Sequence, residues 1–375
     1  MDFLNRSIGR RQFISVSSMV LGAGIIATPS GLLFAANASA QAVGSSKADG
    51  TKYGKYIILS QNSEPTERGI QMFPMGGDFP GFSTVIIGRM PPPGPMPGHD
   101  APEKHSGEIE YLIHLGNNQD DPLDLGADVD FYLGKGKWLE RYAINKSTAV
   151  YLADGMWHCP WKVKKIRTDM TWVNVRIGKA AQGSLPGGAP AGAQGGAPAG
   201  GQSGASAVAQ GGTSSGAPAM ASEEGLSEAE RAKAKTSGYI FDKYLLSGVP
   251  KDMKDPNGGK WIAYTDCTKI AGGALTRIIR YNPKEAPYSI IDSQTHEYGS
   301  LFIFLGTDLK DCTNLGAEVE LSIGPEKEKH TINKSAMVYV PAELKHGPFK
   351  VIKASKPFNF LEIVAGPEMP GAVYG

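Results

Sequence analysis

The sequence predicts an all-β protein in which one domain occurs twice, with a disordered linker between the copies. Three observations predict this. Segments of one half recur in the same order in the other half. Short β-branched and aromatic runs alternate with Gly, Pro, Asn and Asp, as in a protein of many strands. A stretch rich in Gly, Ala, Pro and Ser divides the two halves, and 375 residues suffice for two domains of ordinary size.

The N-terminal segment has the pattern of an export signal. Arg10 and Arg11 precede an apolar run of small residues that ends in Ala-Ser-Ala at residues 38–40. The paired arginines followed by Gln-Phe-Ile resemble the twin-arginine (Tat) export motif. We therefore expect residues 1–40 to be a Tat signal peptide. The Tat export machinery would then deliver a folded periplasmic or secreted protein that has no stable membrane anchor.

The low-complexity stretch at residues 178–225 contains nothing that can form a core, and it is predicted to be a disordered linker. It leaves one predicted domain at residues 41–177 and a second at residues 226–375. One helical pattern, at residues 227–235, directly follows the linker.

The two predicted domains match each other along their length. The matched segments run in one order: KYIILS (55–60) with KYLLS (243–247), STVIIGRMPP (83–92) with LTRIIRYNPK (275–284), LGADVDFYLG (125–134) with LGAEVELSIG (315–324), and HCPWKV (158–163) with HGPFKV (346–351). This is an internal duplication. Many short strands at regular spacing predict a sandwich, such as an immunoglobulin-like one, or a small barrel in each copy.

Charge and cysteine content limit the remaining classes. Lys and Arg number 38 and Asp and Glu number 37, so no excess of basic charge indicates a nucleic-acid partner. In an oxidising compartment Cys267 and Cys312 could form a disulfide, with Cys159 left over.

Each copy also contains two histidines in a similar setting. In the first copy His105 precedes a strand that begins near Glu110, and His158 ends the turn Ala-Asp-Gly-Met-Trp-His. In the second copy His296 and His346 occupy the matching places. There Ser300 aligns with the acid, and the neighbouring Glu297 is the carboxylate expected to be within reach.

These residues resemble the two motifs of the cupin superfamily, a His-rich motif followed by Glu and a second motif PxGxxH. The chain departs from both. Ala153 replaces the Pro in the first copy, Glu343 replaces the Gly in the second, and Glu103 and Lys104 precede His105 where the family often has His-x-His. Because both copies match, the chain resembles a bicupin. The resemblance implies two tandem double-stranded β-helix, jelly-roll-like barrels whose mouths hold a metal ion on imidazole and carboxylate ligands.

Carried over to this sequence, the resemblance implies that His105, Glu110 and His158 are metal ligands. His99 is a further candidate, and Glu108 is a rival for the carboxylate. Imidazole and carboxylate donors suit one divalent transition metal, with Fe or Mn expected first and Ni or Zn as alternatives.

Other residues have more limited expectations. His296 and His346 would form a weaker second site that is empty, weakly metallated or structural. Trp157 is a candidate wall of a substrate pocket. His114 is expected to pack inside the barrel, and His330 is expected in a surface turn.

The expected function is that of an exported metal-dependent oxidoreductase, a dioxygenase or an oxalate-decarboxylase-like enzyme, acting on a small carboxylate or phenolic substrate. A non-catalytic periplasmic binding or structural bicupin is the alternative. A metal store is a third class and should load both copies. The catalytic residues and the possibility of an oligomer stay open.

Overall fold

In the computed structural model the described residues form ten segments: 26–28, 31–33, 51–60, 71–72, 79–92, 96–178, 239–270, 273–283, 286–308 and 310–366. The predicted linker beyond residue 178, the helical pattern at 227–235 and most of the predicted signal peptide lie outside them. Strands β1 (Ile26–Thr28) and β2 (Gly31–Leu33) pair antiparallel.

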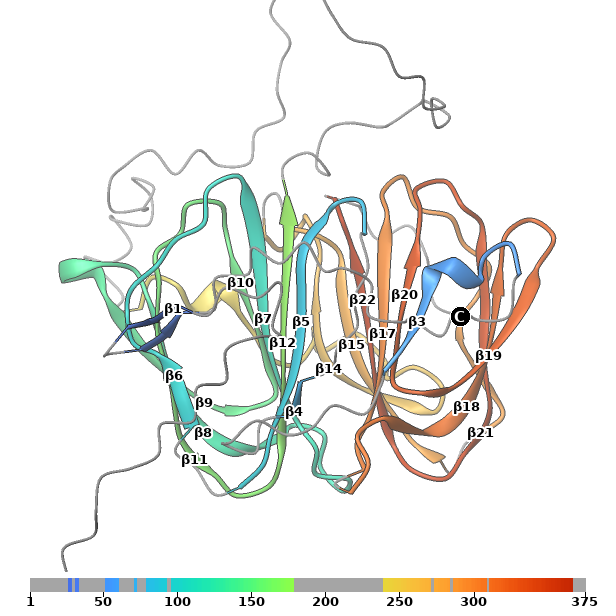
Figure 1. Cartoon of the computed structure of the whole chain (residues 1–375), viewed down its shortest axis with the longest axis horizontal. Coiled ribbons are helices and arrows are strands. Elements are labelled where there is room, and N and C mark those ends of the chain that lie inside the picture. Colours follow the sequence, from blue (N-terminus) through green and yellow to red (C-terminus); the bar gives the residue numbers. More distant parts are fainter. Residues whose placement is uncertain are drawn as a thin grey trace, which may run out of the picture.

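The first barrel consists of two antiparallel sheets (Figure 1). Its six-stranded sheet has the order β13 (Leu245–Leu246), β10 (Thr148–Leu152), β7 (Glu108–Gly116), β12 (Met170–Gly178), β5 (Phe82–Met90) and β4 (Gln71–Met72). Its four-stranded sheet has the order β6 (Met96–His99), β11 (His158–Ile166), β8 (Asp124–Leu133) and β9 (Glu140–Lys146). A short 3-10 turn, η2 (Gly136–Trp138), joins β8 to β9.

The second barrel repeats this plan. Its six-stranded sheet has the order β14 (Gly259–Thr265), β15 (Thr276–Tyr281), β22 (Phe358–Val364), β17 (Ser300–Gly306), β20 (Ala336–Val340) and β3 (Ile57–Leu59). Its four-stranded sheet has the order β16 (Tyr288–Ile291), β21 (His346–Ala354), β18 (Asn314–Ile323) and β19 (Glu328–Lys334).

The predicted fold class is therefore confirmed. Strands β5 to β12 correspond one to one with β15 to β22, and both sets close into two-sheet, double-stranded β-helix barrels. This is the architecture that the resemblance to cupins implies.

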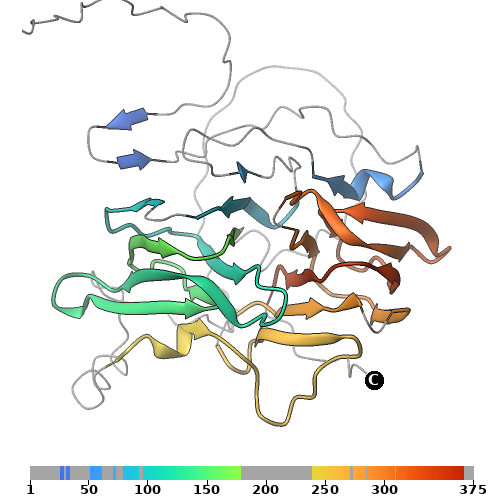
Figure 2. The same cartoon turned by 90° about the horizontal axis from the view of Figure 1, so that it is seen from below.

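The barrels share one apolar core where their six-stranded sheets face each other (Figures 1 and 2). Side chains of a strand alternate between its two faces. On β7, Tyr111 and Ile113 belong to the cluster that also includes Ile278 and Ile303 of the second barrel, and all four have no exposed surface. Both faces of β7 are thus covered, which explains its nearly continuous apolar sequence.

Each barrel takes an edge strand from the other half of the chain. Strand β3, preceded by the 3-10 turn η1 (Gly54–Tyr56), pairs with β20 of the second barrel. Strand β13, preceded by η3 (Asp242–Tyr244), pairs with β10 of the first barrel. Figure 1 shows the blue β3 beside the orange barrel. The domain boundaries at 41–177 and 226–375 stay a prediction, and each barrel contains an arm from the other half of the chain.

Polar contacts hold these arms in place. Glu328 accepts hydrogen bonds from the backbone N–H groups of Lys52 and Tyr53, at 3.1 and 2.9 Å. At the other arm, Glu140 accepts hydrogen bonds from the N–H groups of Ile240 and Phe241. Equivalent strands, β19 and β9, therefore carry the acid that binds each incoming arm.

Buried arginines connect the barrels. Arg280 of β15 has no exposed surface and donates to the carbonyl oxygens of Gly116 (2.6 Å) and Asn118 (2.9 Å). In the opposite direction, the Arg89 guanidinium of β5 donates to the carbonyl of Asp308. Hydrogen bonds from a charged donor are worth about 1.5–3 kcal/mol, so these contacts fix the two barrels against each other.

The structure answers one question that the sequence left open, the pairing of Cys267 with Cys312, and shows that the expectation for His330 is wrong. Within the described part of the chain, no disulfide joins Cys267 and Cys312; the Cys312 thiol lies instead beside Arg89 at the barrel interface. His330 is not in a surface turn but on β19, buried, with Nε2 2.8 Å from Glu328. Strand alternation turns His330 inward even though the surrounding sequence is charged.

A search of the described residues finds no helix with the length and apolar character needed to cross a bilayer.

Candidate metal centre

Backbone pairing brings the two histidine motifs of the first barrel together. Glu103 and His158 exchange both backbone hydrogen bonds at 2.9 Å, so the segment before β7 is fastened to the start of β11. In the turn that precedes β11, the N–H of Gly155 donates to the carbonyl of His105 at 2.8 Å. Gly155 has φ of 75°, a left-handed conformation that favours glycine, which explains this residue in the turn before His158.

Four side chains of the first barrel direct donor atoms towards one point. His105 Nε2 lies 3.3 Å from Glu110 Oε2 and 3.9 Å from Glu103 Oε1. His158 Nε2 lies 3.3 Å from Glu103 Oε1 and 3.7 Å from Glu110 Oε2. Metal–ligand bonds of about 2.0–2.2 Å place neighbouring donor atoms about 3.0–3.6 Å apart. One cation can therefore be held with small side-chain shifts.

The chemistry of these four residues fits a cation. The Nε2 atoms of His105 and His158 and the Oε2 atom of Glu110 are buried, without a hydrogen-bond partner among the described residues. A buried polar atom left unsatisfied costs about 1–3 kcal/mol, and a divalent ion would satisfy all three. His158 Nδ1 lies 3.1 Å from the carbonyl of Met156, a contact that orients Nε2 towards the cluster.

Glu110 is oriented by its neighbours on β12. Asn174 donates a hydrogen bond to Oε1 of Glu110, and Arg176 Nε lies 3.5 Å from the same oxygen. Oε2 is thereby left to face the histidines. Of the two carboxylates considered on β7, Glu110 makes these contacts, while Glu108 lies at the half-exposed start of the strand.

Sequence reasoning missed Glu103. Relative to His105 it lies where the cupin His-x-His motif, which this sequence resembles, has its first histidine, and its side chain is 33% exposed. Burial raises the pKa of Glu103, but the interaction with His158 and the charge of His99 outweigh burial and hold it at about 2. Glu103 is thus a carboxylate ready to bind a cation. The signal for it was its position two residues before His105.

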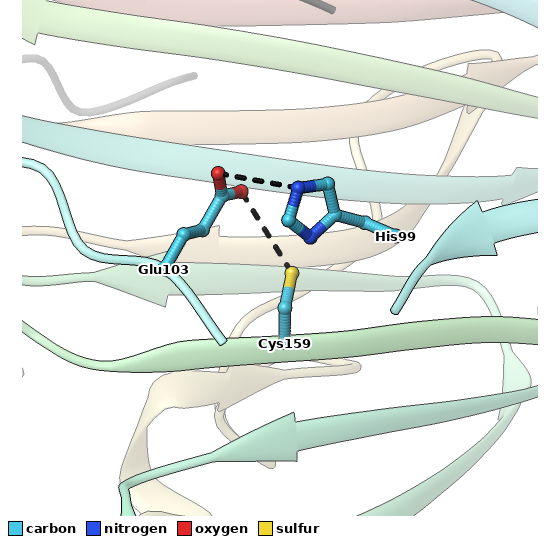
Figure 3. Close-up of side chains that lie close together, drawn as sticks. All are labelled: His99, Glu103 and Cys159. Carbon is cyan, nitrogen blue, oxygen red and sulfur yellow. Dashed lines mark hydrogen bonds and ion pairs between the residues drawn. The ribbon is translucent and has the colours of Figure 1, made fainter. Parts of the chain in front are cut away.

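His99 and Cys159 also contact the Glu103 carboxylate (Figure 3). His99 ends β6 opposite Trp161 of β11, and its Nε2 lies 3.5 Å from Glu103 Oε2. Cys159 follows His158 on β11, with Sγ 3.8 Å from Glu103 Oε1. Burial and the negative charge of Glu103 raise the pKa of the Cys159 thiol. His99, a candidate ligand from its sequence, is thus brought to Glu103.

Other predicted residues have clear positions. The Trp157 ring faces two ammonium groups, Lys135 Nζ at 3.9 Å and Lys104 Nζ at 5.2 Å from its centroid. Its role as a pocket wall stays a prediction. His114 has no exposed surface, lies 6.0 Å from the Trp161 ring, and has its pKa lowered to about 4 by burial. The expectation that His114 packs inside the barrel is confirmed.

The second barrel has a related cluster with different chemistry. His296 and His346 have ring centroids 5.3 Å apart, compared with 5.2 Å for the first-barrel pair. Gln294, which pairs with His346 as Glu103 pairs with His158, donates through Nε2 to Glu362 Oε1 at 3.2 Å. The same amide lies 3.3 Å from His346 Nε2. A neutral amide therefore stands where the first barrel has a carboxylate.

The expectation that Glu297 supplies the acid of the second cluster is wrong. Glu297 is exposed, whereas Glu362 of β22 is fully buried with Oε1 3.3 Å from His296 Nε2. Arg277 of β15 lies 2.7 Å from the other carboxylate oxygen. Burial raises the pKa of Glu362, but the charge of Arg277 together with the interactions with His296 and His346 outweighs burial and lowers it. The comparison of the two repeats in the sequence missed Glu362, because this residue lies on β22, outside both histidine motifs.

No family model matches the chain, and no curated protein matches it. Solved structures show distant likeness. Oxalate decarboxylase of Bacillus subtilis has 11% sequence identity and a TM-score of 0.41, over 82% of this chain and 75% of that one. A structure of the same enzyme that concerns its Mn(II) centres has 10% identity and a TM-score of 0.40, over 83% and 76%. The 7S globulin of Momordica charantia has 8% identity and a TM-score of 0.43, over 83% and 84%.

Proposed function

We propose that this chain is an exported, metal-dependent enzyme whose single catalytic cation binds in the first barrel, and that it carries out oxidoreductase chemistry on a small carboxylate or phenolic compound. The observation that carries the proposal is the convergence of His105 Nε2, His158 Nε2 and two carboxylates at separations of 3.3–3.9 Å. A bound Fe or Mn ion would supply Lewis-acid and redox chemistry there.

The charges near the cluster support an anionic substrate. Arg176 lies at the edge of the cluster with a quarter of its side chain exposed, and its Nε lies 3.5 Å from Glu110 Oε1. Lys104 and Lys135 stand over Trp157, the residue before His158. A guanidinium matches a carboxylate in geometry and charge. These cations would attract and orient a small carboxylate beside the metal ligands.

The second barrel would serve as a scaffold in this scheme. The Gln294 amide already bridges His346 and Glu362, and Arg277 neutralises the acid. The amide thus gives His346 and Glu362 a protein partner at the place where the first cluster has a second carboxylate. A metal store, which should load both barrels, therefore has less support.

A screen of the exported, metal-loaded protein tests this function. Small carboxylates and phenols are supplied under air and without oxygen, while oxygen uptake and carbon dioxide release are followed. Turnover that requires metal and disappears in His158→Ala, but persists in His346→Ala, is the expected result. Turnover that is unaffected by His158→Ala would overturn the proposal.

One observation favours a non-catalytic binding or structural protein instead. Six residues with potential donor atoms lie together, since His99 and Cys159 adjoin the four ligands. If all bound one ion, the coordination shell would be closed to substrate. A metal-loaded protein whose ion exchanges no water, measured by proton relaxation with Mn²⁺, would support this alternative.

A further inference from the structure

His99 and Cys159 form a second set of donor atoms together with Glu103. The ligand atoms of His99, Glu103 and Cys159 all lie within 4.8 Å of one another. Figure 3 shows the imidazole and the sulfur approaching different oxygens of the same carboxylate. Tetrahedral bonds of about 2.0–2.3 Å place neighbouring N, O and S donors about 3.3–3.6 Å apart. The observed 3.5 Å (His99 to Glu103) and 3.8 Å (Cys159 to Glu103) are close to this.

All three donors are replaced in the second barrel. Strand pairing puts Ile291 opposite Phe349 as His99 is opposite Trp161, so an apolar side chain replaces the imidazole. Gln294 replaces Glu103, because each exchanges backbone bonds with the equivalent histidine. Gly347 replaces Cys159, immediately after that histidine. The first barrel thus has three potential metal ligands at these positions. The second barrel has no ionisable side chain at any of them.

The backbone conformation at Cys159 is one that glycine adopts more easily. Cys159 has φ of 68°, and Gly347 of the repeat has φ of 84°. A non-glycine residue with positive φ costs of order 1–3 kcal/mol and is found mainly at functional sites. Cys159 therefore holds a conformation that the second barrel leaves to glycine.

The first barrel also makes room for this sulfur. In the second barrel a Cβ atom at Gly347 would meet the Asp292 carbonyl oxygen at 2.1 Å. There two residues separate Ile291 from Gln294, whereas three separate His99 from Glu103. The first barrel therefore has one more residue in the segment between His99 and Glu103, beside Cys159.

We propose that His99, Glu103 and Cys159 form a second cation site, for a divalent ion of zinc's borderline character, which adjoins the first site through the shared carboxylate of Glu103. On binding, the Cys159 S–H bond breaks, the proton passes to solvent, and the thiolate, the carboxylate and neutral His99 hold the ion. A thiolate and an imidazole favour Zn²⁺ or Co²⁺. The His105, Glu110 and His158 set offers only nitrogen and oxygen.

A cation can reach this site from solvent. The side chains of His99 and Glu103 are 25% and 33% exposed, and Cys159 lies beneath them with 3% of its surface exposed. The site rests on the proposed function only through Glu103, which the two ligand sets would share.

Cobalt substitution of the exported full-length protein tests the proposal. Thiolate-bound Co²⁺ gives a near-ultraviolet charge-transfer absorption, and elemental analysis counts the ions. The wild type is expected to show this absorption with about two Co²⁺ per chain. Cys159→Gly, which introduces the residue of the repeat and removes the strain, should lose the absorption and about one ion while keeping the first. His99→Gln should weaken the second ion, and Cys267→Ser is the thiol control that should change nothing.

The two proposals fail in different ways. His158→Ala should lose the first ion and keep the charge-transfer absorption. If the wild type binds about one Co²⁺ without this absorption, or if the absorption survives Cys159→Gly, the second site is overturned while the proposed function stands. If the absorption is present but His158→Ala loses no ion, the second site stands and the proposed function fails.

Discussion

Glu110 and Glu362 reach equivalent histidines from different strands. Glu110 on β7 lies 3.3 Å from His105, and Glu362 on β22 lies 3.3 Å from His296. In the strand register Glu362 takes the place of Asn174, while Ser300 takes the place of Glu110. Each barrel therefore has one buried carboxylate beside its histidine pair, but the acid has changed strands between the repeats.

Gln294→Glu should create a cation site in the second barrel. The substitution puts a second carboxylate beside Glu362 where the Gln294 amide now donates to it at 3.2 Å. Two close carboxylates repel each other unless a cation lies between them. The variant should bind about one more Zn²⁺ per chain than the wild type, since it restores the first barrel's donor set. Equilibrium dialysis measures this, with Gln294→Leu as the control that gains none; an unchanged count in Gln294→Glu would contradict the interpretation.

Arg277→Met should destabilise the second barrel. Arg277 and Glu362 are 2.7 Å apart, with side-chain exposures of 2% and 0%. Removing one partner of a buried ion pair leaves the other charge without compensation and costs about 3–5 kcal/mol. Urea denaturation should show this loss. The double variant Arg277→Met/Glu362→Gln should recover much of it, and a double variant as unstable as Arg277→Met would argue against charge as the cause.

Arg176→Met should weaken the binding of carboxylate substrates. A charge-assisted hydrogen bond is worth about 1.5–3 kcal/mol, which corresponds to an increase in KM of roughly 10- to 100-fold. Neutral phenolic substrates serve as the internal comparison and should be affected much less. Equal losses for both substrate types would assign Arg176 only the role of orienting Glu110.

A chain cut between residues 179 and 238 should stay together. Each half supplies an edge strand to the other barrel, β3 to β20 and β13 to β10. The barrels also share a buried core. We expect an engineered protease site in this segment to give two fragments that elute as one particle in native size-exclusion chromatography. Fragments that separate without denaturant would show that the exchanged strands contribute little.

The sequence was sufficient to predict much of this structure. Repeated segments and short apolar runs predicted two all-β copies. The order of the segments matched His105 and His158 with His296 and His346, and Glu110 with Ser300. The repeated KYIILS and KYLLS were recognised as a pair. Their exchange between barrels was not, because a strand with the same pattern fits the edge of either copy.

The remaining differences depend on three-dimensional register. Glu362 reaches His296 only because β22 pairs with β17, a neighbour that no local spacing reveals. His330 was assigned to the surface from its charged neighbours, but strand alternation decides its direction. Glu103 could have been found from its place two residues before His105, if a carboxylate had been considered as a substitute for the family's histidine.

Metal content tests the central claim most directly. The exported protein, His158→Ala and His346→Ala would be analysed for transition metals after purification without added metal. The account predicts that the wild type carries Fe or Mn, that His158→Ala loses it, and that His346→Ala keeps it. Absence of a transition metal from all three, or equal loss from both variants, would contradict the assignment of the cation site to the first barrel.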